Sequence, residues 1–153
     1  MGKFTHIMIH CTDTPSGREV SKEDLEQWHI KERGWSRLGY AGIWHLDGEF
    51  EVLTPFDEDG EIESWEITNG ARGWNGRTRH FVYSGGGNNV DTRTVYQLAK
   101  MRSTLIQELH YNPAIKIIGH NQVSSKYCPS FDVPKWCEII RIPKENIDYA
   151  TYY

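Results

Sequence analysis

The stretch from Gly119 to Asp132 contains the residue types best suited to metal chemistry. His120 and Cys128 stand eight residues apart, with Lys126 between them, directly after an apolar run. Imidazole nitrogen and thiolate sulfur are two of the ligand types that zinc favours. The spacing suits a loop that leaves a strand, passes beneath a metal ion and returns. Three protein ligands with one open position form a catalytic zinc site, whereas four protein ligands form a structural one.

A third ligand must come from elsewhere in the chain, and His10 is the candidate. It stands near the end of the isoleucine-rich run 4–11, which predicts a buried strand with His6, Met8 and His10 on one face. If that strand lies beside the strand leading into His120, both imidazoles and the Cys128 loop converge at one end of the sheet. Taken alone, each residue has an ordinary alternative: a histidine that only forms hydrogen bonds, or a cysteine buried as a small hydrophobe.

The bulk composition excludes several other function classes. A length of 153 residues predicts one domain covering residues 1–153. The net charge of -4 and the lack of a Lys/Arg stripe argue against a nucleic-acid partner. No apolar run approaches a membrane span, and the first eleven residues are too polar for a signal peptide. We therefore expect a monomer that is synthesised in the cytoplasm. An odd count of three cysteines fits metal binding or free thiols better than disulfides.

The hydrophobic pattern predicts an α/β fold in one domain, with a central mixed β-sheet flanked by helices. Capping boxes at Ser21/Asp24 and Thr94/Gln97 mark two helix starts, and Asp132 is expected to cap a third helix. Asp47-Gly48 predicts a tight hairpin turn. The expected strands cover 4–11, 38–46, 49–53, 80–83 and 114–118, and the expected helices cover 22–33, 95–111 and the residues after Asp132. Residues 57–66 are acidic and aperiodic, which predicts a solvated surface loop.

These motifs together resemble the type-2 family of zinc-dependent N-acetylmuramoyl-L-alanine amidases, the T7 lysozyme-like enzymes related to peptidoglycan recognition proteins. The most specific part is His120…Lys126-Tyr127-Cys128-Pro129-Ser130-Phe131-Asp132. Similar segments follow the family order along the chain: Ile9-His10-Cys11-Thr12, Gly34-Trp35, Leu38-Gly39-Tyr40, Asp47-Gly48, Gly73-Trp74-Asn75 and the helix from Thr94 to Leu109. The resemblance runs from about residue 4 to residue 140.

The resemblance implies a site and a reaction. Its metal ligands are His10, His120 and Cys128, the cofactor is Zn²⁺, and Tyr40 and Lys126 match the catalytic pair. The implied substrate is peptidoglycan, cut at the amide between N-acetylmuramic acid and L-alanine after the enzyme is released to the cell wall. Substrate contacts are expected from Arg72, Trp74 and Asn75. Without the resemblance, Tyr40 reads as a core aromatic residue and Lys126 as a solvated charge.

Two positions depart from the family pattern. Gly70 and Ala41 stand where relatives carry histidine, so substrate contacts are expected to differ. The acidic segment 57–66 is expected to reshape the edge of the groove.

The main rival function is that of a recognition module that binds peptidoglycan without cutting it, although non-catalytic relatives typically lack the cysteine ligand that Cys128 provides. A structural zinc site would need a fourth ligand, for which only His6 and His29 are unassigned.

Overall fold

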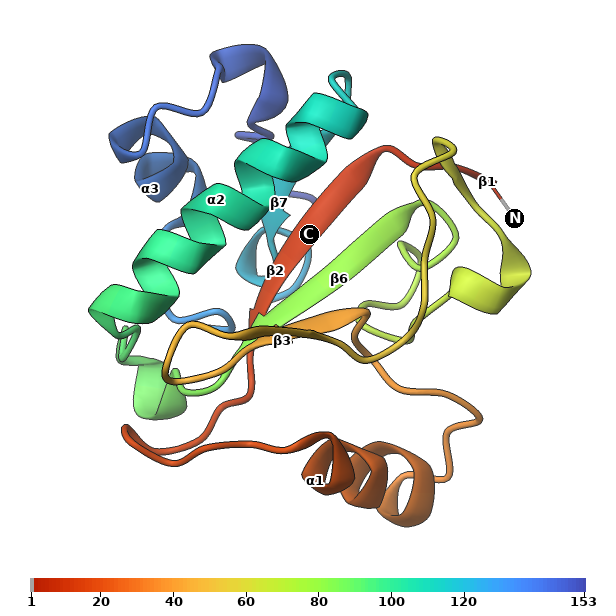
Figure 1. Ribbon diagram of the computed structural model, residues 1–153, viewed down its shortest axis with the longest axis vertical. Helices are drawn as coiled ribbons and strands as arrows, with labels where there is room; N and C mark the ends of the chain where they lie inside the picture. Colours follow the sequence, from red (N-terminus) through yellow and green to blue (C-terminus); the bar gives the residue numbers. More distant parts are fainter. Residues whose placement is uncertain (1) are drawn as a thin grey trace.

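A five-stranded mixed sheet forms the centre of the computed structural model, which describes residues 2–153 (Figure 1). Its strand order is β4-β3-β6-β2-β7, and β2, β3, β6 and β7 run parallel while β4 returns antiparallel to β3. The strands are β2 (His6–Cys11), β3 (Gly42–Trp44), β4 (Phe50–Val52), β6 (Thr78–Tyr83) and β7 (Lys116–Gly119). A separate antiparallel pair joins β1 (Gly2–Lys3) to β5 (Glu61–Ile62). The α/β architecture with a mixed sheet confirms the predicted fold class.

Helices lie on both sides of this sheet. They are α1 (Lys22–Glu26), continued by a π-helical turn (Gln27–Glu32), α2 (Val95–Tyr111) and α3 (Val133–Ile139). Short 3-10 turns cover Ser64–Glu66, Gly87–Asn89, His120–Gln122 and Lys144–Asn146. Both predicted capping boxes are present, and the side chain of Asp132 caps α3. The predicted helix 95–111 is confirmed at both ends.

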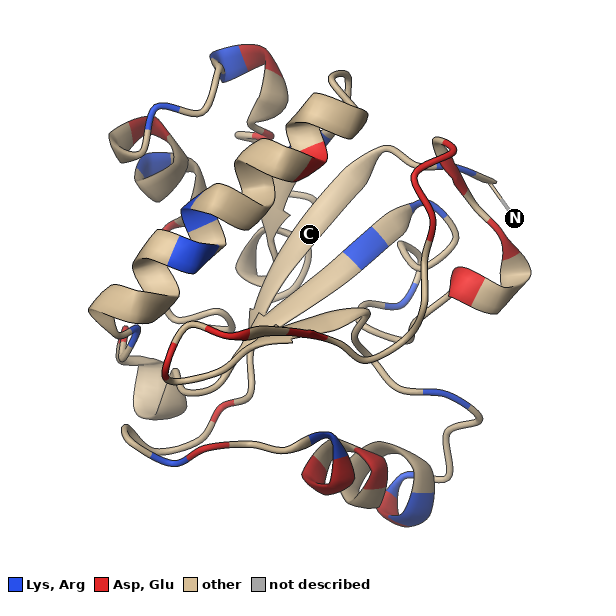
Figure 2. Ribbon diagram, in the orientation of Figure 1, with Lys and Arg blue, Asp and Glu red and all other residues tan. Residues whose placement is uncertain are grey.

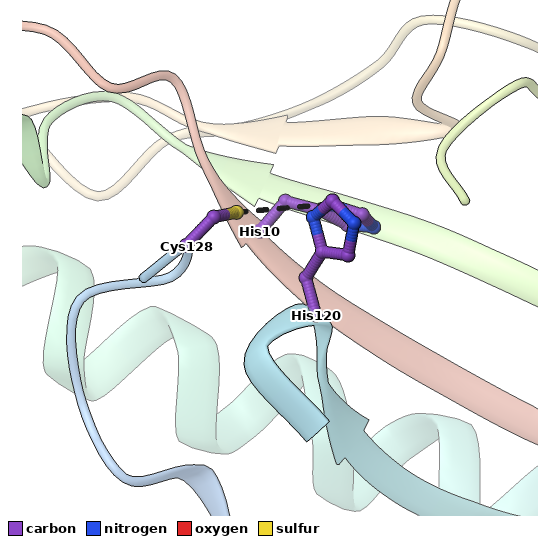
Figure 3. Close-up of side chains that lie close together, drawn as sticks. All are labelled: His10, His120 and Cys128. Carbon is purple, nitrogen blue, oxygen red and sulfur yellow. Dashed lines mark hydrogen bonds between the residues drawn. The ribbon is translucent and has the colours of Figure 1, made fainter. Parts of the chain in front are cut away.

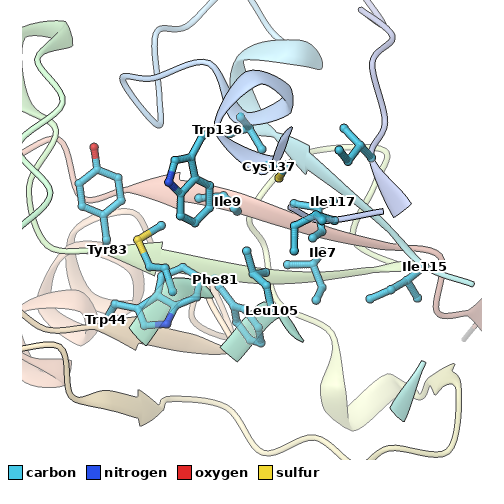
Figure 4. Close-up of a cluster of buried hydrophobic side chains, with 14 of the residues drawn as sticks. Ile7, Ile9, Trp44, Phe81, Tyr83, Leu105, Ile115, Ile117, Trp136 and Cys137 are labelled. Atoms are coloured by element: carbon cyan, nitrogen blue, oxygen red, sulfur yellow. The ribbon is translucent and has the colours of Figure 1, made fainter. Parts of the chain in front are cut away.

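Alternation along β2 divides its side chains between the two faces of the sheet. Ile7 and Ile9 face the helices α2 and α3, where they pack in the main core with Leu105 and Trp136 (Figure 4). The opposite face packs partly on α1 through a second cluster, which contains Val20, Leu25, Leu38, Ile43, Leu53 and Val82. Met8 lies in a third cluster with Trp74 on that same side. The face of β2 that carries His10 is therefore the one turned away from α2.

The predicted strand 38–46 is shorter than expected, and its beginning has a different role. Only Gly42–Trp44 pairs as β3. The backbone N–H of Gly39 donates to Nδ1 of His29 at 3.0 Å, so this part of the chain does not pair in the sheet. Strand β6 begins at Thr78, two residues before the predicted 80–83, and β7 begins at Lys116 rather than at 114.

The acidic segment 57–66 is partly ordered as β5 and a 3-10 turn, and it lies at the end of β2 opposite to Cys11. The backbone N–H of Phe4 donates to Gly60 O at 2.9 Å, and β1 pairs with β5. Figure 2 shows acidic residues along this segment, close to the N-terminus. No helix among residues 2–153 is both long enough and apolar enough to cross a membrane.

Candidate metal centre and active site

Three potential ligands converge at the carboxyl ends of adjacent parallel strands. His10 lies near the end of β2, His120 directly follows β7, and Cys128 lies on the loop after the 3-10 turn (Figure 3). Their ligand atoms all lie within 4.8 Å of one another, and Nδ1 of His10 is 3.9 Å from Sγ of Cys128. Tetrahedral zinc with bonds of about 2.0–2.3 Å separates its ligands by roughly 3.3–3.8 Å. Strands β2 and β7 are neighbours, which is the condition on which the convergence depended, and the three side chains lie together.

The polar atoms of this group fit a zinc ion. Nδ1 of His120 is buried and has no hydrogen-bond partner among residues 2–153. A buried polar atom without a partner is costly in a folded protein, and a bound cation is one explanation for it. Two nitrogens and one sulfur form a donor set that zinc favours. Within the described part of the chain, no other histidine, cysteine or carboxylate joins this group, so it offers three ligand atoms.

The two unassigned histidines, which a closed structural site would need as a fourth ligand, have other partners. Nε2 of His6 is hydrogen-bonded to Oδ2 of Asp148 at 2.8 Å. His29 accepts the Gly39 N–H and stacks against Trp35. Neither side chain belongs to the ligand group, so a closed structural site has no support.

Burial sets the protonation of the ligands. It lowers the pKa of His10 well below the ordinary value, and it lowers the pKa of His120 to about 4, with a smaller contribution from Lys126. Both imidazoles are therefore neutral near pH 7, which is the form that binds metals. In the absence of a cation, the side-chain hydrogen bond with Cys11 and burial raise the pKa of Cys128. The backbone N–H of Cys11 donates to the Cys128 sulfur at 3.3 Å and favours its thiolate.

His120 and Cys128 line a pocket of about 790 Å³ that is also lined by both predicted catalytic side chains. Tyr40 packs its ring 5.1 Å from the ring of His10, and Lys126 is exposed on the Cys128 loop. Burial raises the pKa of Tyr40, so its hydroxyl remains a proton donor. Arg33 and Arg72 line the same pocket, which gives it three cationic side chains.

The predicted substrate contacts divide into two groups. Arg72 is exposed and lines the pocket, as does Asn75. Trp74 requires a correction, because it is 8% exposed and is not among the residues that line the pocket. Its ring packs against His6 and Tyr152, and the Arg77 guanidinium lies 4.2 Å above it. The chain reversal at residues 71–77 turns Trp74 toward the core and leaves Arg72 outside.

The expectation for the acidic segment also requires correction. None of residues 57–66 lines the pocket, because the segment lies at the other end of β2. It instead brings Asp57, Asp59, Glu63 and Glu66 close together, and Glu66 accepts hydrogen bonds from backbone N–H groups of the same segment. These carboxylates therefore organise their own loop rather than the groove.

Sequence reasoning did not identify His80, which lies directly behind the metal site. Its Nδ1 is hydrogen-bonded to Nε2 of His10 at 2.8 Å, and its Nε2 to Oδ1 of Asn75 at 2.9 Å. The sequence placed His80 in a predicted strand. It did not show which strand lies beside that one, so the contact with His10 could not be predicted. A second unforeseen contact joins the Tyr127 hydroxyl to Asp13 at 2.5 Å across the rim of the pocket.

Gly70 and Ala41, the two positions where relatives carry histidine, have different surroundings. A Cβ atom at Gly70 would lie 2.3 Å from Cγ of His80, so the His80 ring occupies the space beside Gly70. Ala41 is 2% exposed and donates its N–H to the carbonyl of His80 at 2.7 Å. Ala41 is therefore a core residue that holds the irregular segment against β6.

The fold is that of the N-acetylmuramoyl-L-alanine amidases and peptidoglycan recognition proteins. An N-acetylmuramoyl-L-alanine amidase, LysC from Clostridium intestinale, superimposes with a TM-score of 0.72, at 20% identity, over 91% of this chain and 86% of that chain. A mutant of Drosophila PGRP-LB in complex with tracheal cytotoxin gives a TM-score of 0.72 at 19% identity, over 97% of this chain and 86% of that chain. No protein-family model matches the chain.

Sequence comparison identifies the family. The endolysin of Klebsiella phage KP32 is 31% identical over 139 residues, which cover 88% of this chain and 85% of that protein. The endolysin of Escherichia phage T7 is 31% identical over 139 residues, covering 86% and 84%. The chain belongs to this family of T7 lysozyme-like phage endolysins, the type-2 amidase family that its motifs resemble.

Proposed function

We propose that this protein is a zinc-dependent N-acetylmuramoyl-L-alanine amidase that hydrolyses peptidoglycan between N-acetylmuramic acid and L-alanine. The observation that carries the proposal is the convergence of His10, His120 and Cys128 at a pocket that also contains Tyr40 and Lys126. The whole chain, residues 1–153, acts as one amidase domain. Its endolysin relatives support action on the cell wall after release from the cell.

The three ligands would hold Zn²⁺, which supplies Lewis-acid polarisation and lowers the pKa of bound water. His10 and His120 bind in their neutral forms, and the Cys11 N–H stabilises the sulfur of Cys128. Three protein ligands would leave the zinc accessible to the substrate from the pocket.

Tyr40 and Lys126 supply the donors that the reaction needs. Negative charge develops on the carbonyl oxygen of the amide in the transition state, and a fixed donor beside it lowers the barrier. Tyr40, whose hydroxyl stays protonated, and Lys126 both line the pocket, which supports assigning this role to them. The leaving amine also needs a proton, so one donor stabilises the oxygen and the other assists the amine.

The rim of the pocket suits an anionic peptide. Arg33 and Arg72 line it together with Lys126, and stem peptides of peptidoglycan carry carboxylates. Guanidinium groups bind carboxylates with two parallel hydrogen bonds. We assign Arg72 to binding of the stem peptide.

The rival function is recognition of peptidoglycan without cleavage. It is favoured by one observation, the similarity of the fold to recognition proteins such as PGRP-LB, whose structure includes tracheal cytotoxin. The presence of Cys128 within the ligand group favours the enzyme, because the group would otherwise lack its third ligand.

Digestion of purified muropeptides separates these functions. The zinc-loaded protein is expected to release stem peptides with a free N-terminal L-alanine and to create no new reducing sugar ends. Cys128→Ala is expected to remain folded and to lose both zinc and activity, whereas Ser125→Ala, a change on the same loop, keeps both. One zinc per chain without release of peptide would leave only the recognition function.

A further inference from the structure

A line of three hydrogen bonds lies behind the ligand His10. Nε2 of His10 is bonded to Nδ1 of His80 at 2.8 Å, and Nε2 of His80 is bonded to Oδ1 of Asn75 at 2.9 Å. The backbone N–H of Ala71 also donates to the Asn75 Oδ1, at 3.0 Å. Strand β6 places His80 there because its residues pair in parallel register with β2, and His10 is opposite Val82.

The direction of these bonds follows from the last donor. A backbone N–H can only donate, so the Asn75 atom that receives the Ala71 N–H is the carbonyl oxygen, which cannot donate to His80. The hydrogen between His80 and Asn75 therefore belongs to His80 Nε2. In a neutral imidazole the other nitrogen is an acceptor, so His80 Nδ1 receives the N–H of His10 Nε2.

This direction determines which nitrogen of His10 is free. With its hydrogen on Nε2, His10 presents the lone pair of Nδ1 toward Cys128, whose sulfur is 3.9 Å away. The opposite tautomer would place a hydrogen on the nitrogen that faces the ligand group. Metal-binding histidines commonly have their orientation and tautomer set by a hydrogen bond on the other ring nitrogen.

Gly70 provides the space that His80 needs. His80 is fully buried, and a Cβ atom at residue 70 would lie 2.3 Å from its Cγ and 2.4 Å from its Nδ1. Any larger residue at position 70 must displace the ring that contacts His10. The absence of a side chain at Gly70, where the family motif carries histidine, and the presence of His80 are therefore two parts of one arrangement.

We propose that His80, oriented by Asn75 and accommodated by Gly70, is a positioning residue that fixes the tautomer and orientation of the metal ligand His10. This inference rests on the proposed function, since it requires that His10 bind zinc. It predicts that His80 affects zinc affinity in addition to catalysis, without itself touching the metal or the substrate.

The test measures zinc affinity by chelator competition in the full-length protein. His80→Ala is expected to weaken zinc binding by about 10- to 100-fold, the range found when such supporting hydrogen bonds are removed. His80→Gln, whose carbonyl oxygen can accept the His10 N–H, is expected to recover part of that loss. Thr78→Val is the matched control, a buried change on the same face of β6, and is expected to leave zinc affinity unchanged.

A second readout does not depend on the metal. Nitrogen-15 NMR of the zinc-free protein is expected to show His10 with its hydrogen on Nε2, and a mixture of tautomers in His80→Ala. If His80→Ala does not fold, Asn75→Leu provides the same comparison from the other end of the hydrogen-bond line. A His10 that carries its hydrogen on Nδ1 in the wild-type protein would overturn the proposal.

A double-mutant cycle tests the pairing with Gly70. Gly70→Ala is expected to weaken zinc binding in the wild-type background and to add nothing in the His80→Ala background. Equal zinc affinity in wild type and folded His80→Ala would contradict the proposal. Failure of the proposed function looks different: zinc binds and depends on His80, but no peptide is released from muropeptides.

Discussion

Arg79 and His80 are adjacent in strand β6, and each belongs to a buried polar cluster. The two clusters differ in how their polar atoms are paired. His80 points toward His10 and the proposed metal site, whereas Arg79 points to the opposite face of the sheet. Arg79 donates to Glu58 and Glu108, each at 2.8 Å, and its guanidinium lies 4.0 Å from the centre of the Phe56 ring. Both clusters are buried beside the same strand, so burial alone does not distinguish a site from a structural network.

The difference lies in which atoms remain without partners among residues 2–153. In the Arg79 cluster, opposite charges neutralise one another, and Nε of the guanidinium is the unpaired atom of that side chain. In the His10 cluster, no described carboxylate joins the group, Nδ1 of His120 has no partner, and the group opens into a pocket. Buried ligand atoms that converge without satisfying one another indicate a binding site, whereas a charge-paired cluster indicates a role in stability.

The largest effect is expected from His120→Ala, which should abolish activity without harming the fold. Removal of one of three ligands should lower zinc occupancy and reduce amidase activity by about 10³-fold or more, because a metal supplies several kcal/mol of transition-state stabilisation. Since Nδ1 of His120 has no partner within the described chain, the zinc-free variant should unfold at the same urea concentration as zinc-free wild type. If zinc-free His120→Ala were much less stable than zinc-free wild type, the His10 cluster would also have a role in stability, and the contrast with the Arg79 cluster would not hold.

Arg79→Met is expected to show the opposite pattern. Removal of the buried cation leaves Glu108 without its partner and should lower the free energy of unfolding by about 3–5 kcal/mol. Burial already raises the pKa of Glu108 to about 7, and Arg79 opposes that rise. Urea denaturation measures the loss, and Arg79→Met/Glu108→Gln should recover part of it. Zinc affinity of the folded variant should equal that of wild type, and a weaker affinity would mean that the clusters are coupled through β6.

Lys126→Ala sharpens the distinction within the pocket between binding and catalysis. It should reduce kcat by about 10²–10³-fold, the range for loss of one donor to the developing oxyanion. Zinc occupancy and stability should be unchanged, because Lys126 is exposed and is not a ligand. Lys135→Ala, an exposed lysine on α3, is the control. Normal turnover in Lys126→Ala would leave Tyr40 as the catalytic donor.

The smallest effect concerns His45, a charge-paired histidine outside both clusters. Partial burial lowers its pKa, but hydrogen bonds to Glu19 and Glu51 outweigh this and raise it above the ordinary value. Because the folded pKa is higher than the unfolded one, the stabilisation is full below about pH 6.5 and disappears as pH rises through the folded value. The free energy of unfolding of the wild type should exceed that of His45→Gln by less than about 1 kcal/mol at pH 6, because solvent screens the contacts of His45 with the two glutamates. The difference should vanish at pH 9. Urea titrations at the two pH values measure this difference in stability. A difference that grows as the pH rises would contradict the prediction.

Local sequence signals determined much of the fold and pointed to the three candidate ligands. The capping boxes at Ser21 and Thr94 place two helix starts, because their hydrogen bonds span only three residues. Alternation correctly divided the side chains of β2 between its two faces. His10, His120 and Cys128 were identifiable from residue type and motif, and the structure brings them together.

Only the tertiary structure decided what surrounds those ligands. The order of β7, β2 and β6 in the sheet places His80 behind His10, and no periodicity in the chain reports which strands are neighbours. The reversal after Arg72 buries Trp74 in the core and brings Asn75, which still lines the pocket, within hydrogen-bond distance of His80. Residue type and local pattern are properties of short segments, whereas these contacts join residues far apart in sequence and depend on how the segments pack.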